Sequence, residues 1–129
     1  MSTKVSFGLP YPTSRTIVGP ELHLQSSLLE VRYDCEQDDG AVEWVQVSFH
    51  DTLAFEYRQV ALCKAEDLDA YNKIVKYLES DWLDEMKDRW RNFLGSQASE
   101  SQGQRYAHWR IYFDDAGCID VIAKSFQIG

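Results

Sequence analysis

Strict alternation of apolar and polar residues near the end of the chain constrains the fold more than any other feature. In residues 108–113 the apolar side chains fall on every second position, which is the period of a β-strand. Asp114-Asp115-Ala116-Gly117 follows, and its glycine can take the positive φ that a turn needs. Residues 118–123 are apolar on both parities, as expected of a strand covered on both faces. The segment predicts a C-terminal β-hairpin whose second strand lies inside a sheet.

Alternation predicts further strands upstream. They are a short edge strand over 4–9, a half-buried strand over 43–50 and an extended segment over 52–63. Within 21–34 the apolar parity changes at Ser26-Ser27, which is the shift that a β-bulge produces. Asp39-Gly40 lies between two alternating runs and predicts a hairpin turn.

After residue 65 the apolar spacing changes to three or four, which predicts an amphipathic helix over 65–78. Its stripe consists of Leu68, Tyr71, Val75, Leu78 and Trp82. Ser80 or Asp81 can cap a second helix that ends at Gly95, and one long bent helix is the alternative. The residues expected to face inward in the second helix are Met86, Trp90 and Phe93. We expect the stripe to pack on a sheet that carries Trp109, Ile111, Phe113 and Val121.

The order of these elements predicts an α+β fold: an antiparallel β-sheet with one or two helices packed on one face and a C-terminal β-hairpin. The length of 129 residues fits a single domain over 1–129. Residues 1–20 contain all three prolines, and we expect them to form an N-terminal arm.

The charge balance restricts the partners. The chain has 13 Lys and Arg against 21 Asp and Glu, a formal net charge of −8. An acidic surface repels nucleic acid and anionic membranes, so we expect neither as a partner. The start of the chain lacks an apolar signal and no apolar run is long enough for a membrane span, which predicts a cytoplasmic location. Cys35, Cys63 and Cys118 are expected to be free thiols.

No short catalytic, metal-binding or nucleotide-binding signature occurs in the sequence. Asp34–Gly40 lacks calcium ligands at the required positions. Cys118 and His108 would lie several residue pairs apart on the predicted hairpin. We therefore expect no catalytic residue, no cofactor and no metal site, and the balance favours a protein that is not an enzyme.

Acidic residues cluster in the segments 34–43 and 79–88. Such clusters either steer a basic protein toward its binding site or only solvate the surface. Trp44 lies on the polar parity of its strand, where it is either an interface anchor or covered by another element. The candidate partner-binding residues are Asp38, Asp39, Trp44, Asp84 and Glu85.

Two stretches carry a family resemblance. The first is "WVQVSFHDTLAFEY" at 44–57, followed by the predicted acidic helix that ends in "LESDWL" at 78–83, and the second is "HWRIYFDDAGCIDVIAKSF" at 108–126. Together they resemble a loose group of small uncharacterised bacterial cytoplasmic α+β proteins, some of which are similar to immunity partners of secreted toxins. The resemblance covers about half of the chain and implies no catalytic residues.

Three functional hypotheses follow. The first is a non-catalytic protein-interaction domain, similar to an immunity or inhibitor protein, that binds a basic protein. The second is a small-molecule-binding domain or enzyme with a pocket between sheet and helices, lined by Tyr33, His50, Tyr57 and Tyr112. The third is a structural subunit of a homo-oligomer, with a homodimer as the simplest case.

Overall fold

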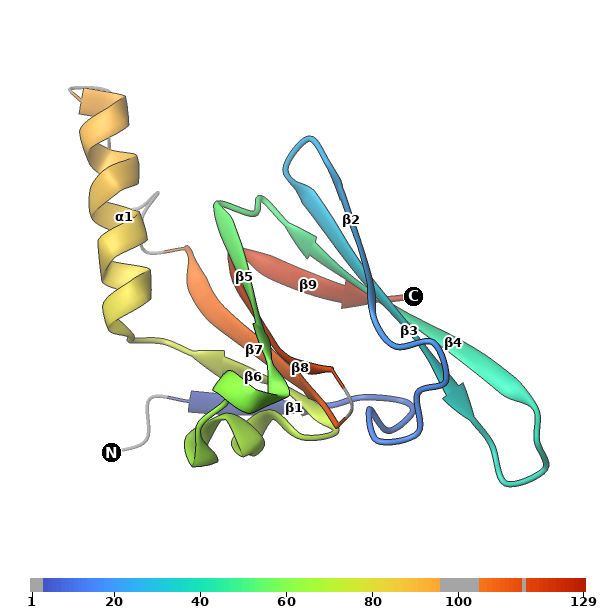
Figure 1. Cartoon of the computed structure of the whole chain (residues 1–129). Helices are drawn as coiled ribbons and strands as arrows, with labels where there is room; N and C mark the ends of the chain where they lie inside the picture. Colours follow the sequence, from blue (N-terminus) through green and yellow to red (C-terminus); the bar gives the residue numbers. More distant parts are fainter. Residues whose placement is uncertain (1–3, 96–104, 115) are drawn as a thin grey trace.

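The computed structural model of the chain describes residues 4–95, 105–114 and 116–129 (Figure 1). Its strands form two sheets in which neighbouring strands are antiparallel. Sheet A has the order β1-β6-β7-β8-β5, with β1 at Lys4–Gly8, β5 at Ala54–Gln59, β6 at Lys73–Tyr77, β7 at Ala107–Phe113 and β8 at Gly117–Ala123. Sheet B has the order β2-β3-β4-β9, with β2 at Glu21–Gln25, β3 at Leu28–Glu36, β4 at Val42–His50 and β9 at Ser125–Ile128.

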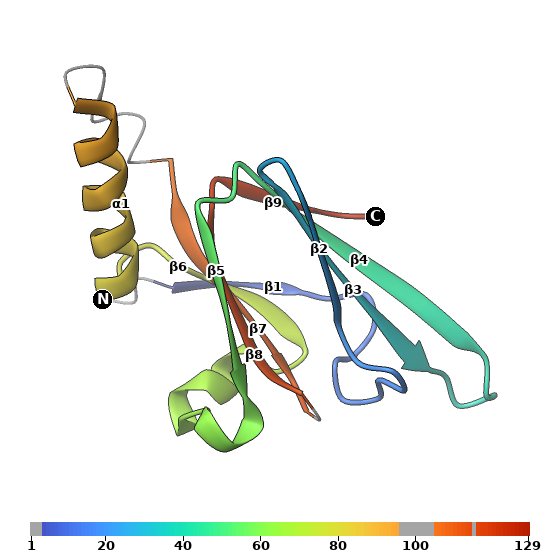
Figure 2. The ribbon, with the colours of Figure 1, turned by 45° about the horizontal axis from the view of Figure 1, so that its top comes forward.

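Three helical elements complete the described part of the chain. They are the 3-10 helices η1 at Val60–Leu62 and η2 at Ala65–Ala70, and the α-helix α1 at Asp81–Leu94. Figures 1 and 2 show α1 on the side of sheet A that is turned away from sheet B. None of the helices in the described ranges is long and apolar enough to cross a membrane.

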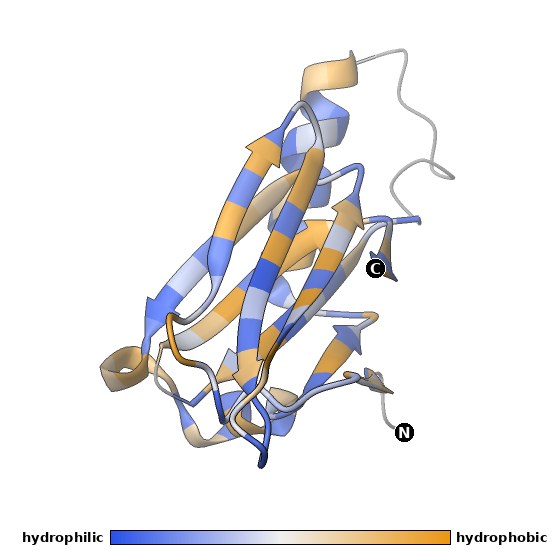
Figure 3. Cartoon of the chain, turned by 90° about the vertical axis from the view of Figure 1, so that its right-hand side faces the viewer, coloured by the Kyte–Doolittle hydropathy of each residue, from blue (hydrophilic) through white to orange (hydrophobic). Residues whose placement is uncertain are grey.

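The main core lies between the two sheets. Figure 3 shows hydrophobic and hydrophilic residues alternating along the strands, and this alternation turns one set of side chains from each sheet inward. Sheet B contributes Leu29, Val31, Tyr33, Val45, Val47 and Phe49, and sheet A contributes Ile74, Trp109, Ile111, Phe113, Ile119 and Val121. The single sheet that we expected is therefore wrong, because β2, β3, β4 and β9 form a second layer against the first. The α+β prediction is confirmed in part, because the strands are antiparallel and a helix packs on a sheet.

The predicted C-terminal hairpin is confirmed. β8 lies between β7 and β5, and every residue of β8 is buried, as expected from its apolar residues on both parities. Gly117 has a φ of +119°, and a Cβ there would lie 2.1 Å from the Arg58 carbonyl oxygen. Only glycine allows β5 to approach the turn so closely.

The helix that we predicted over 65–78 is wrong. Residues 65–70 form η2, and residues 73–77 form β6. Asn72 has a φ of +60°, which ends a helical path, and the β-branched pair Ile74-Val75 favours a strand. Ile74 faces the core and Val75 packs below η2. Because neighbouring residues of β6 are both apolar, its sequence does not show the alternation that identifies a strand. Of the expected stripe, Leu68 and Leu78 are half exposed.

The second predicted helix is confirmed as α1, with Ser80 as its N-cap: Ser80 Oγ accepts the Leu83 N–H at 3.1 Å. One long bent helix is ruled out by β6. Met86 and Trp90 are partly buried against Ile122, whereas Phe93 is 81% exposed and its inward orientation was wrong.

The predicted β-bulge at Ser26-Ser27 is a turn instead. Ser26 has a φ of +56°, and Gln25 pairs with Leu28 across a two-residue loop. Leu24 and Leu29 are opposite each other in this hairpin and share a face, which explains the change of parity. The expected edge strand over 4–9 is confirmed as β1, at one edge of sheet A.

The N-terminal arm is tied to both sheets. The Thr13 hydroxyl donates to the Tyr112 carbonyl oxygen at 2.7 Å. The Asp34 carboxylate accepts the N–H groups of Ile17 and Val18 at 3.0 Å. These contacts explain why Asp34 is buried although it lies in an acidic segment.

Candidate functional site

A set of charged side chains lies on the outer face of sheet A, away from sheet B. Trp109 and Ile111 point into the core, so His108 and Arg110 on the same strand point outward. The register puts Asp120 of β8 opposite Arg110. η2 and the start of α1 cover this face, and His108, Arg110 and Asp120 are 9% exposed or less.

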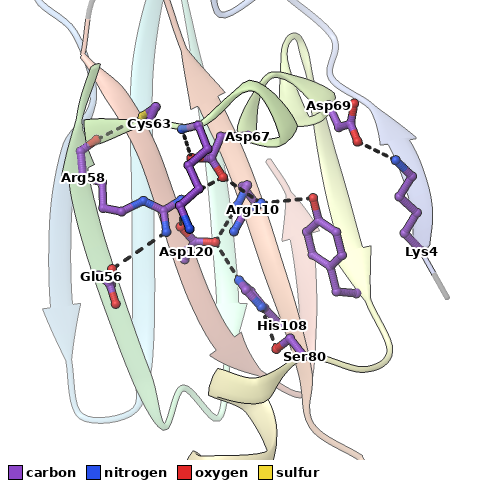
Figure 4. A network of polar contacts seen from close by, with 12 residues as sticks. Lys4, Glu56, Arg58, Cys63, Asp67, Asp69, Ser80, His108, Arg110 and Asp120 are labelled. Atoms are coloured by element: carbon purple, nitrogen blue, oxygen red, sulfur yellow. Dashed lines mark hydrogen bonds and ion pairs between the residues drawn. The ribbon is translucent and has the colours of Figure 1, made fainter. Parts of the chain in front are cut away.

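Asp120 is the centre of a buried cluster of charges (Figure 4). Its Oδ1 accepts from His108 Nε2 at 2.6 Å and from Arg110 Nε at 2.7 Å. Its Oδ2 forms an ion pair with the Arg58 guanidinium at 3.0 Å. Three elements, β5, β7 and β8, therefore meet at one carboxylate.

Asp67 links η2 to the same cluster. Its Oδ1 lies 3.1 Å from Arg58 and 2.9 Å from Arg110, and its Oδ2 accepts the Lys64 N–H at 2.8 Å. Two carboxylates and two guanidinium groups balance one another. A buried charge is tolerated only when it is paired in this way.

The protonation states follow from these contacts. Burial alone would raise the pKa of Asp120, but the hydrogen bond from His108 and the charge of Arg110 outweigh it, so that its pKa is below the ordinary value. Desolvation alone would lower the pKa of Arg110, but the nearby Asp120 charge raises it above the ordinary value. Both groups remain charged at neutral pH.

A pocket of about 300 Å³ opens above this cluster, between η2 and the start of α1. It is lined by Glu66, Asp69, Tyr77, Ser80, His108 and Arg110. His108 Nδ1 lies 2.9 Å from Ser80 Oγ, and Tyr77 Oη accepts from Arg110 at 3.2 Å. Asp69 at the rim is paired with Lys4 at 2.6 Å.

Cys63, Asp67 and Cys118 offer ligand atoms that lie within 4.8 Å of one another. A metal ion would need thiolates here, whereas burial raises the pKa of Cys118 to about 12. The Cys63 thiol donates to the Gln59 carbonyl oxygen at 3.4 Å, and Arg58 already pairs with Asp67. The raised pKa of Cys118 and the pairing of Asp67 with Arg58 both disfavour a cation at this place. All three cysteines of the chain are free, as expected.

The structure brings some of the predicted partner-binding residues together. Asp38 and Asp39 lie at the tip of the β3–β4 hairpin, and Trp44 lies near that tip on the outer face of sheet B. Trp44 is 43% exposed within the described part of the chain, and the Arg32 guanidinium lies 4.9 Å from its ring centroid. Asp84 and Glu85 lie on α1, at the other side of the molecule in Figures 1 and 2.

Several of these acidic groups have local partners. Asp38 pairs with Arg15, and the Asp39 carboxylate accepts the Ala41 N–H at 2.9 Å within the turn. Glu85 pairs with Arg89 one helical turn away at 2.6 Å.

An apolar cleft separates the edge strands β2 and β5. Leu22 and Leu24 are paired with core residues of β3, and Phe55 and Tyr57 with core residues of β8, so all four point between the sheets. They are nevertheless 39% to 50% exposed. A groove of about 350 Å³ lies there, lined in part by the arm residues 16–20.

Sequence reasoning missed the cluster around Asp120 and predicted a different pocket. Tyr33 lies in the core and His50 on the outer face of sheet B, so they do not line a pocket between sheet A and the helices. The turn at 114–117 was the signal that could have revealed the cluster. It sets a register in which Arg110 lies opposite Asp120. Two opposite charges that face each other on a covered strand indicate a buried ion pair.

No family model matches the chain, and neither a curated protein nor a solved structure does. The resemblance to immunity proteins therefore stays a prediction.

Proposed function

We propose that the chain is a protein-interaction domain that binds a basic protein through the end of its β3–β4 hairpin. The observation that supports this proposal most directly is that Trp44 is exposed on the polar face of an acidic hairpin. The surface concerned, the acidic hairpin end, consists of Glu36, Asp38, Asp39, Val42, Glu43 and Trp44, all exposed.

The chemistry of this surface supports the proposal. Val42 and Trp44 lie on one face of β4 and are each more than 40% exposed. An exposed aromatic residue with an apolar neighbour and a charged rim is typical of an interface hot spot. Four carboxylates, those of Glu36, Asp38, Asp39 and Glu43, lie at this end of the hairpin, and among the described residues only Asp38 of these four forms an ion pair, with Arg15.

The net charge of −8 favours a basic partner over an acidic one. An immunity or inhibitor protein is the specific form of the proposal. In that form the carboxylates of the acidic hairpin end would occupy a cationic cleft, for instance that of a nuclease, in place of the phosphates of its substrate.

The proposal is tested by affinity capture from the cell that produces the protein, followed by mass spectrometry. The bait is the full chain, the Trp44→Ala variant or the Phe93→Ala variant. Phe93 is a matched control because it is an exposed aromatic residue on α1, far from the hairpin in Figure 1. A basic protein should be retained by the wild type and by Phe93→Ala, and lost with Trp44→Ala. Equal retention by all three would contradict the proposal.

A second candidate, a subunit of a homo-oligomer, is favoured by the apolar cleft between β2 and β5. Large apolar side chains on two open edges are often covered by another chain. Light scattering tests it: a mass near twice 14.9 kDa that returns to the monomer value in Leu24→Glu supports a dimer through the cleft. A monomer mass for the wild type at high concentration contradicts it.

A further inference from the structure

Ser80, His108 and Asp120 form one line of hydrogen bonds that ends in the pocket at the start of α1 (Figure 4). The ionised Asp120 can only accept, so the proton between it and His108 is on Nε2. In the neutral imidazole Nδ1 is then an acceptor, and the Ser80 hydroxyl donates to it over 2.9 Å. For a neutral His108, the contacts therefore fix both the tautomer of the ring and the direction of the Ser80 proton.

The geometry points to a second activity that is independent of the protein interaction: hydrolysis of a small ester, with Ser80 Oγ as nucleophile and His108 Nδ1 as general base. Asp120 is the positioning residue, because it holds the imidazole without touching the substrate. A nucleophile, a base within hydrogen-bond reach and a group that orients the base are the requirements of this chemistry. Here the base is Nδ1 of His108, and its distance of 2.9 Å from Ser80 Oγ is within the hydrogen-bond reach that a general base needs.

The N-cap role of Ser80 explains only part of its contacts. A cap needs an acceptor oxygen, which Ser80 supplies to the Leu83 N–H, and an asparagine would supply one as well. The hydroxyl proton is not needed for the cap. Its acceptor is a buried histidine that Asp120 holds in place.

The charges around His108 suit a base that becomes a cation during reaction. The Arg58 and Arg110 charges are balanced by Asp67 and Asp120. A proton on His108 would therefore add one positive charge to a neutral cluster, with Glu66 and Asp69 in the wall of the same pocket. Asp69 is already paired with Lys4, but the Glu66 carboxylate disfavours an anionic substrate, so the pocket of about 300 Å³ fits a small neutral or cationic ester.

The reaction balances with water as the co-reactant. Ser80 Oγ bonds to the ester carbonyl carbon while its proton moves to His108 Nδ1. The carbon–alkoxide bond then breaks, and this proton passes to the leaving alcohol. Water attacks the acyl-Ser80 carbonyl and gives a proton to His108 Nδ1, which returns it to Ser80 Oγ as the acid leaves.

Backbone N–H groups are available for the oxyanion of each tetrahedral intermediate. The first N–H groups of an α-helix have no acceptor within the helix. At α1 the Leu83 N–H is used by Ser80 Oγ and the Asp84 N–H by the Ser80 carbonyl oxygen. Within the described residues the N–H groups of Asp81 and Trp82 have no acceptor, so they can donate to an oxyanion formed at Ser80.

The experiment uses two probes on the full chain: p-nitrophenyl acetate for turnover, and a fluorophosphonate, which loses fluoride when Ser80 Oγ bonds to its phosphorus. Ser80→Asn keeps the cap but removes the hydroxyl, and Ser80→Thr keeps both. Ser125→Ala, an exposed serine on β9, is the control for surface reaction. Thermal melting checks that each variant is folded.

We expect the phosphonyl label on the peptide that contains Ser80, and a loss of ester hydrolysis of about 100-fold or more in Ser80→Asn and in His108→Gln. Ser80→Thr should retain measurable turnover, and Ser125→Ala should match the wild type. An unlabelled Ser80 in the folded wild type, or a Ser80→Asn rate equal to the wild-type rate, would overturn the inference. The line of hydrogen bonds would then only fasten α1 to sheet A, and the proposal for Trp44 would be unaffected.

Discussion

At the scale of single residues, Asp120 connects the fold to the candidate pocket. It is 1% exposed and contacts His108, Arg110 and Arg58. Removing one partner from a buried ion cluster leaves the others uncompensated, which costs far more than the loss of an exposed pair.

The variant Asp120→Asn tests this role. It leaves Arg58 and Arg110 with a single carboxylate, Asp67, and we expect the free energy of unfolding to fall by on the order of 3–5 kcal/mol. Urea unfolding at pH 7 measures the change. Asp39→Asn, at an exposed turn, is the matched control and should change stability by less than about 0.5 kcal/mol. Equal effects of the two variants would show that the cluster contributes nothing.

The pH dependence of stability has a definite sign. The folded-state pKa of Asp120 is below its ordinary value of 3.8, so its contribution is complete above that value. The contribution is lost as the pH falls through the lower, folded-state pKa. Urea unfolding between pH 6 and pH 2 should therefore show a steeper acid loss in the wild type than in Asp120→Asn. Parallel curves would contradict the depressed pKa.

At the scale of elements, strands with one clear face and the covered strand β8, which follows a recognisable turn, were predictable, whereas the covered strand β6 was not. Alternation predicted β4 and β7 because one parity is apolar from Val45 to Phe49 in β4 and throughout β7. The β7–β8 turn carries a recognisable glycine, so the hairpin was predictable, although Phe113 pairs with Gly117 and not with residue 118 as we expected. In β6 both Ile74 and Val75 are buried, and apolar residues at neighbouring positions imitated a helical stripe.

Val75→Ala and Leu68→Ala separate the strand from the predicted helix. Val75 is fully buried below η2, whereas Leu68 is 52% exposed. We expect a loss of about 1–4 kcal/mol for Val75→Ala, from lost burial and the cavity left behind, and less than about 0.5 kcal/mol for Leu68→Ala. A helix with both residues on its buried stripe would give comparable losses, and denaturant unfolding distinguishes the two results.

Gly117→Ala tests the close approach of β5 to the β7–β8 turn. Gly117 and Gly40 both have positive φ, +119° and +83°, so alanine is strained at either site. Only at Gly117 would the new Cβ meet backbone, at 2.1 Å from the Arg58 carbonyl oxygen. We expect Gly117→Ala to lose about 1–3 kcal/mol more stability than Gly40→Ala. A smaller or reversed difference in thermal unfolding would mean that β5 is not held against the turn.

At the scale of the whole molecule, sequence reasoning recognised most strands but not their division between two sheets. Periodicity assigns a face to each strand, yet it does not say which strands are neighbours. β8 and β9 are separated by Lys124 alone, and the chain passes from sheet A to sheet B at that residue. The charged cluster was missed for the same reason, because Arg58 and Asp67 are brought to Asp120 by tertiary packing.

The division into two sheets also separates the two acidic segments. Asp38, Asp39 and Trp44 share the hairpin of sheet B, whereas Asp84 and Glu85 lie on the helix outside sheet A. The central claim is that recognition of a basic partner depends on the acidic hairpin end and not on the total charge.

The most direct test is the association rate of the captured partner, measured at low and high salt with two charge-matched double variants. Asp38→Asn with Asp39→Asn, and Asp84→Asn with Glu85→Gln, each change the net charge from −8 to −6 by removing two carboxylates. The account predicts that at low salt the hairpin pair slows association by about tenfold and the helix pair by less than about twofold. The difference should shrink at high salt, because ions screen the steering field. Equal slowing by both pairs would contradict the account, since total charge alone would then govern the encounter.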